Sequence, residues 1–377
     1  MSPAAEATDT GRDQSSEHPP VRRRVYEEWK GEEVFFCSGR CMAGPSWKSV
    51  VGTTVMLLVP SGVFWGLVVP KFLSSPGLAA ALWAVSLTLV SLSMAFLFTT
   101  ACIDPGVLPR NPGPDPEWLA GRRPRTAEVM VNGHKVVLRY NETCGFYQPP
   151  RAHHCSVNDN CIERFDHHCP WVGTTIGVRN YRFFLLFVFT TTLLCLFVLA
   201  ICLYQLFFLE AQLSEESDGS GSVWLEVIKQ SIAALIIMVY CFVLFWFVGG
   251  LSLFHTYLVS TNQTTYENFR YSHDGRVNPY NRGCRANCAE VFCRRLPKSK
   301  VNRRAYADEV VFEPPRIEGL TFASPGVNAD GHVRGASNGH RALQNGAVAA
   351  STVGPPGVEV EMLRQGGSRP LRGGSSS

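Results

Sequence analysis

Four long segments of the 377-residue sequence lack any charged side chain. They lie between Lys48 and Lys71, between Lys71 and Asp104, between Arg182 and Glu210, and from Gln230 to Phe254. Each is long enough to cross a bilayer, which takes about 20 helical residues, and four such segments argue against the buried helices of a soluble protein. Because lipid offers the backbone no hydrogen-bond partners, a spanning segment must be helical. We therefore predict an all-α polytopic membrane protein with helices near 49–69, 78–100, 183–209 and 230–254.

Other absences limit the topology and the class of protein. The first 20 residues lack an apolar core, so we expect no cleaved secretory signal and an uncleaved anchor in the first helix. Residues 210–227 lack lysine and arginine, whereas basic residues precede the first helix and lie near both ends of the loop between helices two and three. Both termini and this loop are therefore expected to be cytosolic. The predicted helices offer mainly Ser, Thr and Tyr as polar residues, which argues against a transporter or channel.

The chain is expected to divide at the ends of the helices. We predict a cytosolic N-terminal segment 1–48, helices one and two in 49–100, a cytosolic loop domain 101–182, helices three and four in 183–254, a cytosolic juxtamembrane segment 255–312 and a tail 313–377. Residues 1–20 and the tail are poor in large apolar side chains, which predicts disorder. In the loop domain, two valine-rich runs around Asn132-Gly133 predict a small β-hairpin with a primed turn.

The loop domain is rich in cysteine and histidine. It contains Cys144, His153, His154, Cys155, Cys161, His167, His168 and Cys169. Because the loop is assigned to the reducing side of the membrane, these thiols are expected to be nucleophiles or metal ligands and not disulfides. A loop without an obvious apolar core is often stabilised by zinc, although no intact Cys-x2-Cys pair is present and the spacing alone does not establish a zinc site.

The segment Asp166–Cys169 places a candidate nucleophile beside a candidate base. In extended chain His167 and Cys169 share one face, while His168 points to the other. Pro170 favours extended or turned backbone at Cys169, which predicts a displayed thiol. Each residue alone could instead be a metal ligand or a turn residue.

Several motifs of the sequence resemble those of the DHHC family of protein S-acyltransferases. They are Pro149–Cys155, Asp166–Gly173, Ile176-Gly177, Asn180-Tyr181, Asp104–Gly106, Thr264–Glu267, and Asn278–Tyr280 with Asn287. The resemblance covers roughly residues 22–295. It implies that Cys169 takes a palmitoyl group from acyl-coenzyme A and passes it to a cysteine of a substrate protein. His167 is implied to activate Cys169, and Asp166 to orient His167.

The resemblance and the surrounding sequence suggest supporting residues. Trp171 is expected at the mouth of an apolar acyl cavity. Thr265 is implied to help position Asp166, and Asn287 to hold the C-terminal segment against the membrane domain. Coenzyme A phosphates need cations, although positive-inside topology explains cytosolic arginines equally well. The candidate cations are Arg151, Arg164, Arg179 and Arg182.

Members of the family usually hold two zinc ions in this domain, each with three cysteines and one histidine. For the first ion this chain keeps Cys144, His154 and Cys161, with Asn141 at the fourth position. For the second it keeps Cys155 and His168, with Asn158 and Thr175 in place of cysteines. With three of its four ligands, the first site is expected to be weakened. Two ligands rarely hold a structural zinc, so the second ion is disfavoured. A polar network is the alternative for the second lobe.

These observations leave two functions open. The complete Asp166–Cys169 segment favours an S-acyltransferase, while the three missing ligand cysteines allow a catalytically silent membrane scaffold or adaptor. The expected partners are the lipid bilayer and membrane-associated substrate proteins with cytosolic cysteines, and no nucleic acid. The resemblance is compatible with the Golgi, the endoplasmic reticulum or the plasma membrane.

Overall fold

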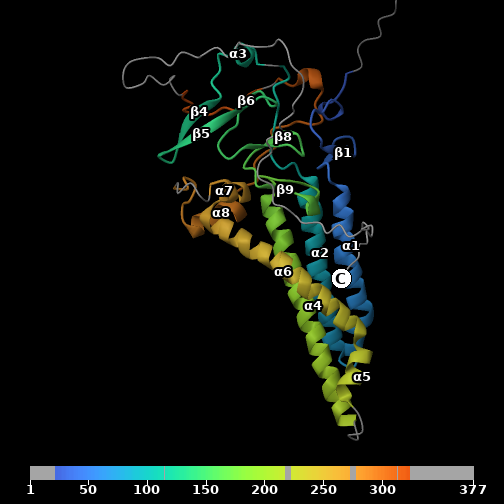
Figure 1. The fold of residues 1–377 in the computed structure, drawn as a ribbon. Helices are drawn as coiled ribbons and strands as arrows, with labels where there is room; N and C mark the ends of the chain where they lie inside the picture. Colours follow the sequence, from blue (N-terminus) through green and yellow to red (C-terminus); the bar gives the residue numbers. More distant parts are fainter. Residues whose placement is uncertain (1–21, 114, 217–221, 272–276, 312, 323–377) are drawn as a thin grey trace, which may run out of the picture. The chain divides into compact units, whose positions relative to one another are not determined.

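The computed structural model describes residues 22–113, 115–216, 222–271, 277–311 and 313–322 (Figure 1). Four helices of this part are long and apolar enough to cross a membrane, which confirms the predicted number of spans. They cover Lys48–Phe72, Pro76–Cys102, Tyr181–Glu215 and Ile232–Thr261. The predicted disordered segment 1–20 and most of the predicted tail lie outside the described residues.

The membrane helices carry an apolar core between them and apolar side chains on their outer faces. Helix α4 (Tyr181–Glu216) packs against both α2 (Pro76–Cys102) and α6 (Ile232–Thr261). Helix α1 (Lys48–Val63) continues as a π-helical and then a 3-10 segment to Phe72. Hydroxyl groups link the helices: Ser93 donates to Thr190 at 3.1 Å, and the hydroxyls of Thr192 and Ser252 are 2.8 Å apart. The exposed outer residues are those that lipid would cover.

The loop domain is built largely of short antiparallel strands, so the all-α description holds for the membrane helices and not for this domain. Frequent prolines and turns leave no run long enough for a stable helix there. The strands are β3 (Val107–Leu108), β4 (Thr126–Val131), β5 (His134–Asn141), β6 (Phe146–Tyr147), β7 (His153–Cys155), β8 (Asn160–Ile162), β9 (His167–Cys169) and β10 (Thr174–Ile176), with the short helix α3 (Pro116–Leu119) between β3 and β4. The N-terminal segment adds β1 (Val34–Phe36) paired with β2 (Cys41–Ala43).

The predicted hairpin is present between β4 and β5. Val131 faces His134 across the two-residue turn, and both turn residues have positive φ, 48° at Asn132 and 79° at Gly133, as a primed turn requires. Beyond the hairpin, Thr321 exchanges two backbone hydrogen bonds with Glu128 of β4, at 2.8 and 2.9 Å. The described start of the predicted tail is therefore held at the edge of this sheet.

The segments after the fourth membrane helix fold back onto the loop domain. Helix α7 (Thr265–Tyr271) follows α6 after a left-handed residue, Asn262 (φ 52°), and α8 (Cys284–Phe292) packs against α6. The short helix α5 (Val223–Gln230) precedes α6. The backbone N–H of Tyr266 in α7 donates to the carbonyl of Asp166 at 3.2 Å, so the end of the last membrane helix reaches the segment before β9.

Candidate active site

Strand β9 places His167 and Cys169 beside the membrane helices. It pairs with β10, and the backbone at Cys169 is extended (φ −109°, ψ 108°), as predicted from Pro170. A tight turn follows, in which Gly173 has φ 68° and approaches the backbone of Ser46 so closely that a Cβ atom would lie 2.7 Å from its carbonyl oxygen. The Cys169 side chain itself is 6% exposed and belongs to the helix core, so the expectation of a displayed thiol is wrong. Membrane helices cover the strand, which the local sequence could not indicate.

The carboxyl group of Asp166 is buried and has three hydrogen-bond donors. Its Oδ2 atom lies 2.6 Å from His167 Nδ1 and accepts the Thr265 hydroxyl at 2.8 Å. Its Oδ1 atom accepts the Thr265 backbone N–H at 2.9 Å. Burial alone raises the pKa of this carboxyl, but the bonds from His167 and Thr265 outweigh burial and lower it below its usual value. Asp166 is therefore a buried carboxylate that is bonded to the imidazole of His167 and held by two bonds from Thr265.

The side chain of His167 is hydrogen-bonded to both Asp166 and Cys169. Because Nδ1 is bonded to Asp166, Nε2 is the ring nitrogen that can form a hydrogen bond with the thiol. Burial by itself lowers the pKa of His167, but hydrogen bonding to Asp166 and to Cys169 outweighs burial and raises it to about 10. The ring packs edge-on against Phe184 of α4, with centroids 5.3 Å apart. These contacts favour the protonated imidazolium form of His167.

His168 points away from this pair, as the alternation of an extended strand predicts. Its Nδ1 atom lies 3.1 Å from both Asn158 Oδ1 and Thr175 Oγ1, and its Nε2 atom lies 3.4 Å from Ser46 Oγ. The side chain of His167 therefore faces the helix core, and that of His168 faces the loop domain.

Cys144, His154 and Cys161 come together as a buried cluster whose ligand atoms lie within 4.8 Å of one another. His154 Nδ1 is 3.6 Å from Cys144 Sγ and 4.0 Å from Cys161 Sγ, and His154 Nε2 is 3.4 Å from Asp159. Hydrogen bonding from Cys161 lowers the pKa of Cys144 to about 5. Asn141 is not directed at the cluster as a ligand, because its side-chain oxygen accepts the backbone N–H of Cys144 at 2.8 Å.

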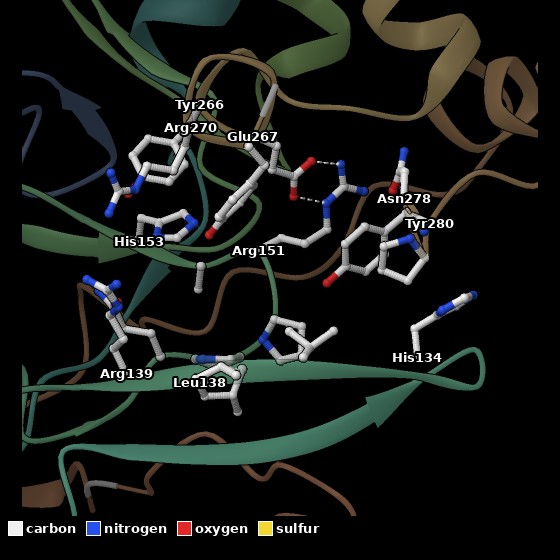
Figure 2. Close-up of a pocket in the computed structure, with 18 of the residues that line it drawn as sticks. His134, Leu138, Arg139, Arg151, His153, Tyr266, Glu267, Arg270, Asn278 and Tyr280 are labelled. Atoms are coloured by element: carbon white, nitrogen blue, oxygen red, sulfur yellow. Dashed lines mark hydrogen bonds and ion pairs between the residues drawn. The ribbon is translucent and has the colours of Figure 1, made fainter. Parts of the chain in front are cut away.

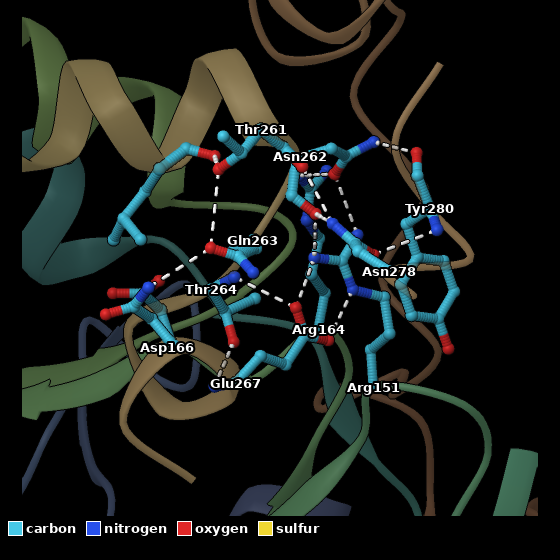
Figure 3. A network of polar contacts seen from close by, with 12 residues as sticks. Arg151, Arg164, Asp166, Thr261, Asn262, Gln263, Thr264, Glu267, Asn278 and Tyr280 are labelled. Atoms are coloured by element: carbon cyan, nitrogen blue, oxygen red, sulfur yellow. Dashed lines mark hydrogen bonds and ion pairs between the residues drawn. The ribbon is translucent and has the colours of Figure 1, made fainter. Parts of the chain in front are cut away.

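The four candidate arginines are all bonded to protein groups. Arg151 contacts Glu267 through two bonds of 2.7 Å and stacks over Tyr280 (Figure 3). Arg164 contacts Glu290 at 3.2 Å. Both guanidinium groups also donate to the side-chain oxygen of Asn262, at 2.9 Å each. They join the end of α6 to the loop domain.

The remaining two arginines hold other parts of the chain. Arg179 bonds Asp104 at 2.9 Å, and Arg182 donates to backbone carbonyls of Val291 and Arg294. All four therefore have structural partners, and their contact with a coenzyme stays a prediction.

The supporting residues expected from the resemblance lie in different places. Thr265 contacts Asp166, as described above. The side chain of Asn287 is buried in α8 and donates to the carbonyl of Ser260 at 2.8 Å, which ties α8 to the end of α6. Trp171 is 48% exposed and lies edge-on to Phe247 of α6, with ring centroids 6.0 Å apart.

A pocket of about 750 Å³ opens beside the active site between β5, the segment before β7, and α7 (Figure 2). Tyr266 and His153, whose rings are 4.0 Å apart, form one wall, and the opposite wall carries Arg139 of β5. Arg139 is exposed and forms no ion pair with any described residue. Tyr266, which lines this pocket, follows Thr265 in the chain, and Thr265 is the residue that is bonded to Asp166.

Comparison with known proteins identifies the family. A family model described as DHHC palmitoyltransferase matches residues 134–272. Probable protein S-acyltransferase 7 of Arabidopsis thaliana is 42% identical over 319 residues, covering 81% of this chain and 70% of that protein. The chain belongs to the DHHC palmitoyltransferase family. Protein S-acyltransferase 8 of the same plant is 41% identical over 316 residues, covering 79% of this chain and 75% of that protein.

The zinc ions expected of a DHHC protein fit one lobe of this chain and not the other. In the first lobe two thiols and one imidazole share a buried site, a donor set that suits zinc with its fourth position open. In the second lobe, Cys155 and His168 are not joined by a third thiol, imidazole or carboxylate among the described residues. The prediction of a weakened first site is consistent with this cluster.

Some residues of the site gave no recognisable signal in the sequence. Glu33, 125 residues before Asn158, is bonded to it at 3.0 Å. His255 of α6 is buried and bonded to the hydroxyl of Tyr181, with its ring 6.1 Å from that of His167. Asn262 could have been found, because an asparagine after a long apolar helix is typical of a left-handed cap.

Proposed function

We propose that Cys169 is the residue that carries the acyl group, with His167 as its base and Asp166 as the residue that orients His167. The chain is a protein S-acyltransferase, which transfers palmitoyl groups onto proteins. The observation that supports this assignment is the 2.6 Å contact between Asp166 and His167, fixed by Thr265, with Cys169 on the same face of β9. The full set of reacting groups argues against a silent scaffold.

The reaction follows from the protons that His167 can hold. His167 Nε2 takes the Cys169 proton, and the thiolate attacks the thioester carbonyl of palmitoyl-coenzyme A. The bond from the carbonyl carbon to coenzyme A sulfur breaks, and the coenzyme A thiolate takes the proton from His167. In the second half a substrate cysteine gives its proton to His167 and attacks the acyl-Cys169 thioester. The bond from the acyl carbon to Cys169 sulfur breaks, and the released Cys169 thiolate takes the proton back from His167. One thioester replaces another in each half, so no nucleotide hydrolysis is needed.

The proposal is tested by locating the acyl group. Purified full-length chain is incubated with an alkynyl palmitoyl-coenzyme A, digested, and analysed by mass spectrometry for label that hydroxylamine removes. We expect the label on the peptide that contains Cys169. Label found only on other cysteines would overturn the assignment of Cys169.

The acyl chain and the coenzyme would occupy different surroundings. Burying a long acyl chain between apolar helices gains on the order of 10 kcal/mol, at about 0.8 kcal/mol per methylene. Trp171 lies at the end of the helices next to Cys169, where the mouth of such a cavity is expected. We place the phosphate-bearing part of coenzyme A in the 750 Å³ pocket, because Arg139 there has no described ion-pair partner. The four arginines predicted to bind coenzyme A would then have a structural role, because they connect the loop domain and the ends of the helices.

Replacing Arg139 with alanine is expected to raise the KM for palmitoyl-coenzyme A about 5- to 10-fold with little change in kcat, because one charge-assisted hydrogen bond is lost in both the bound and the transition state. Steady-state kinetics at several palmitoyl-coenzyme A concentrations measures both constants. Arg122→Ala is the matched control, since Arg122 is an exposed arginine bonded to Glu117 and does not line the pocket. An unchanged KM in Arg139→Ala would exclude Arg139 as the phosphate contact.

We further propose that Cys144, His154 and Cys161 hold one structural zinc ion. Replacing Cys161 with serine is then expected to lower the zinc content from about one to near zero per chain and to lower the melting temperature, since zinc binding contributes folding energy. Elemental analysis of the purified protein measures the metal. Cys37→Ser, which alters an exposed thiol, serves as the control. Full zinc content in Cys161→Ser would contradict the assignment.

The chain is a multi-pass membrane protein by its four spans. We propose that both termini and the loop domain face the cytosol, where the substrate cysteines lie, because basic residues flank these segments.

A further inference from the structure

The second lobe of the loop domain contains a polar cluster where a DHHC protein is expected to hold its second zinc ion. We propose that this lobe is closed without metal, by a hydrogen-bond network in which the carboxylate of Glu33, from the N-terminal segment, takes the place of the ion. The inference concerns the architecture of the domain and does not depend on the roles proposed for Cys169 and His167.

Four side chains of this cluster are bonded directly to one another. The Thr175 hydroxyl donates to Asn158 Oδ1 at 2.6 Å and lies 3.1 Å from Cys155 Sγ. His168 Nδ1 is 3.1 Å from both oxygens. Asn158 and Thr175 are fully buried, and Cys155 is 3% exposed. The group is therefore compact and its polar atoms are already satisfied by one another.

The donor set does not fit a structural zinc ion. Such sites take four ligands, almost always thiolates and imidazoles, and this cluster supplies one of each. The other two side chains are neutral, and the oxygen of Asn158 already accepts the Thr175 hydroxyl. A metal would have to displace that bond to gain a poor ligand.

Glu33 completes the network from outside the loop domain. One of its oxygens accepts the side-chain amide of Asn158 at 3.0 Å. The other accepts the amide of Asn160 at 2.7 Å and the indole N–H of Trp29 at 2.6 Å. Glu33 is buried, and burial raises the pKa of its carboxyl, while the three N–H donors that converge on its oxygens act in the opposite direction. A cysteine at position 158 would have no amide to offer Glu33, so the acid and the asparagine complement each other.

The network also connects the active strand with the first lobe. His168 is the residue between His167 and Cys169, so the network holds β9 from the side opposite the thiol. Toward the first lobe, Asn160 accepts a bond from Arg110 at 3.2 Å, and Arg110 pairs with Asp159 at 2.7 Å. Loss of Glu33 is therefore expected to loosen both β9 and the loop domain as a whole.

Counting zinc in matched variants of the full-length protein tests the proposal. We expect Cys155→Ser to leave the zinc content of the wild type unchanged, because Cys155 holds no metal. We expect the double variant Asn158→Cys, Thr175→Cys to gain one zinc ion per chain, because with Cys155 and His168 it completes a set of three thiolates and one imidazole. A loss of one zinc per chain in Cys155→Ser would overturn the proposal.

The role of Glu33 has its own readout. Glu33→Ala is expected to lower the melting temperature and the rate of self-acylation while the zinc content per chain stays at the wild-type value. In the double-cysteine background, where metal closes the lobe, the same Glu33→Ala change is expected to have a smaller effect on the melting temperature. Equal effects in both backgrounds, or no effect in the wild type, would show that Glu33 does not replace the ion. If the double variant fails to fold, the zinc count of Cys155→Ser and the melting temperature of Glu33→Ala still decide the question.

Discussion

Replacing Cys169 with serine is expected to abolish formation of the acyl-enzyme, with a fall in hydroxylamine-labile label of at least about 10³-fold, since His167 cannot deprotonate an alcohol as readily as a thiol. The change replaces one sulfur atom with oxygen in a buried residue and leaves the bond between His167 and Asp166 in place. Fluorescence of an alkynyl palmitoyl group on the purified protein, read after gel separation, measures the label. Transfer to a substrate protein should disappear in parallel, because it passes through the same thioester.

The matched control is Cys37→Ser, which makes the same atomic change at an exposed thiol of the N-terminal hairpin and should keep full labelling. Zinc content and melting temperature should match the wild type in both variants. Persistent hydroxylamine-labile label in folded Cys169→Ser would exclude Cys169 as the acyl carrier.

Local and periodic features of the chain were predictable from the sequence. The four spans follow from uninterrupted apolar composition, and the turn at Asn132-Gly133 follows from two residues that tolerate positive φ. The opposite directions of His167 and His168 follow from the geometry of an extended strand, which Pro170 favours. These features depend on neighbouring residues and therefore need no knowledge of the tertiary fold.

Features that depend on distant partners could not be predicted. Nothing near Glu33 indicates that its carboxylate meets Asn158, and nothing near Arg151 indicates that Glu267 neutralises it. The burial of Cys169 was mispredicted because its cover comes from membrane helices that are far away in the sequence. Apart from the predicted hairpin of β4 and β5 and the extended chain of β9, the strands of the loop domain were missed because each has only two or three residues, too few to show an alternating pattern.

Replacing Asp166 with asparagine is expected to slow self-acylation at neutral pH by about 10²- to 10⁴-fold, the range that proper proton transfer contributes. The amide keeps the size of the side chain but removes the charge that stabilises the His167 imidazolium. Its NH₂ group can also face His167 Nδ1 or the Thr265 N–H, where the carboxylate offered only acceptors. Rapid-mixing measurement of label on Cys169 gives the rate.

The pH profile distinguishes this electrostatic role from a purely structural one. In the wild type the pKa of His167 is raised to about 10, so the imidazolium persists through neutral pH and the rate should change little between about pH 7 and 9. Without the charge of Asp166, two of the interactions that raise the pKa of His167 are lost while burial still lowers it, so we expect this pKa to fall and the neutral imidazole to become more abundant at neutral pH. The neutral imidazole then no longer holds the thiol proton. The residual rate of Asp166→Asn should therefore rise with pH toward the usual thiol pKa of about 8.5.

Thr265→Val provides the graded comparison for this prediction. It removes the hydroxyl that donates to Asp166 at 2.8 Å and keeps the backbone N–H bond of 2.9 Å, so the carboxylate stays charged but is less firmly oriented. One lost hydrogen bond to a charged group corresponds to about 1.5–3 kcal/mol, or roughly a 10- to 150-fold slower rate at most, with the flat pH profile of the wild type retained. A steep pH profile in Thr265→Val, or a flat one in Asp166→Asn, would contradict the view that the charge of Asp166 sets the proton affinity of His167 and that Thr265 acts only on its position.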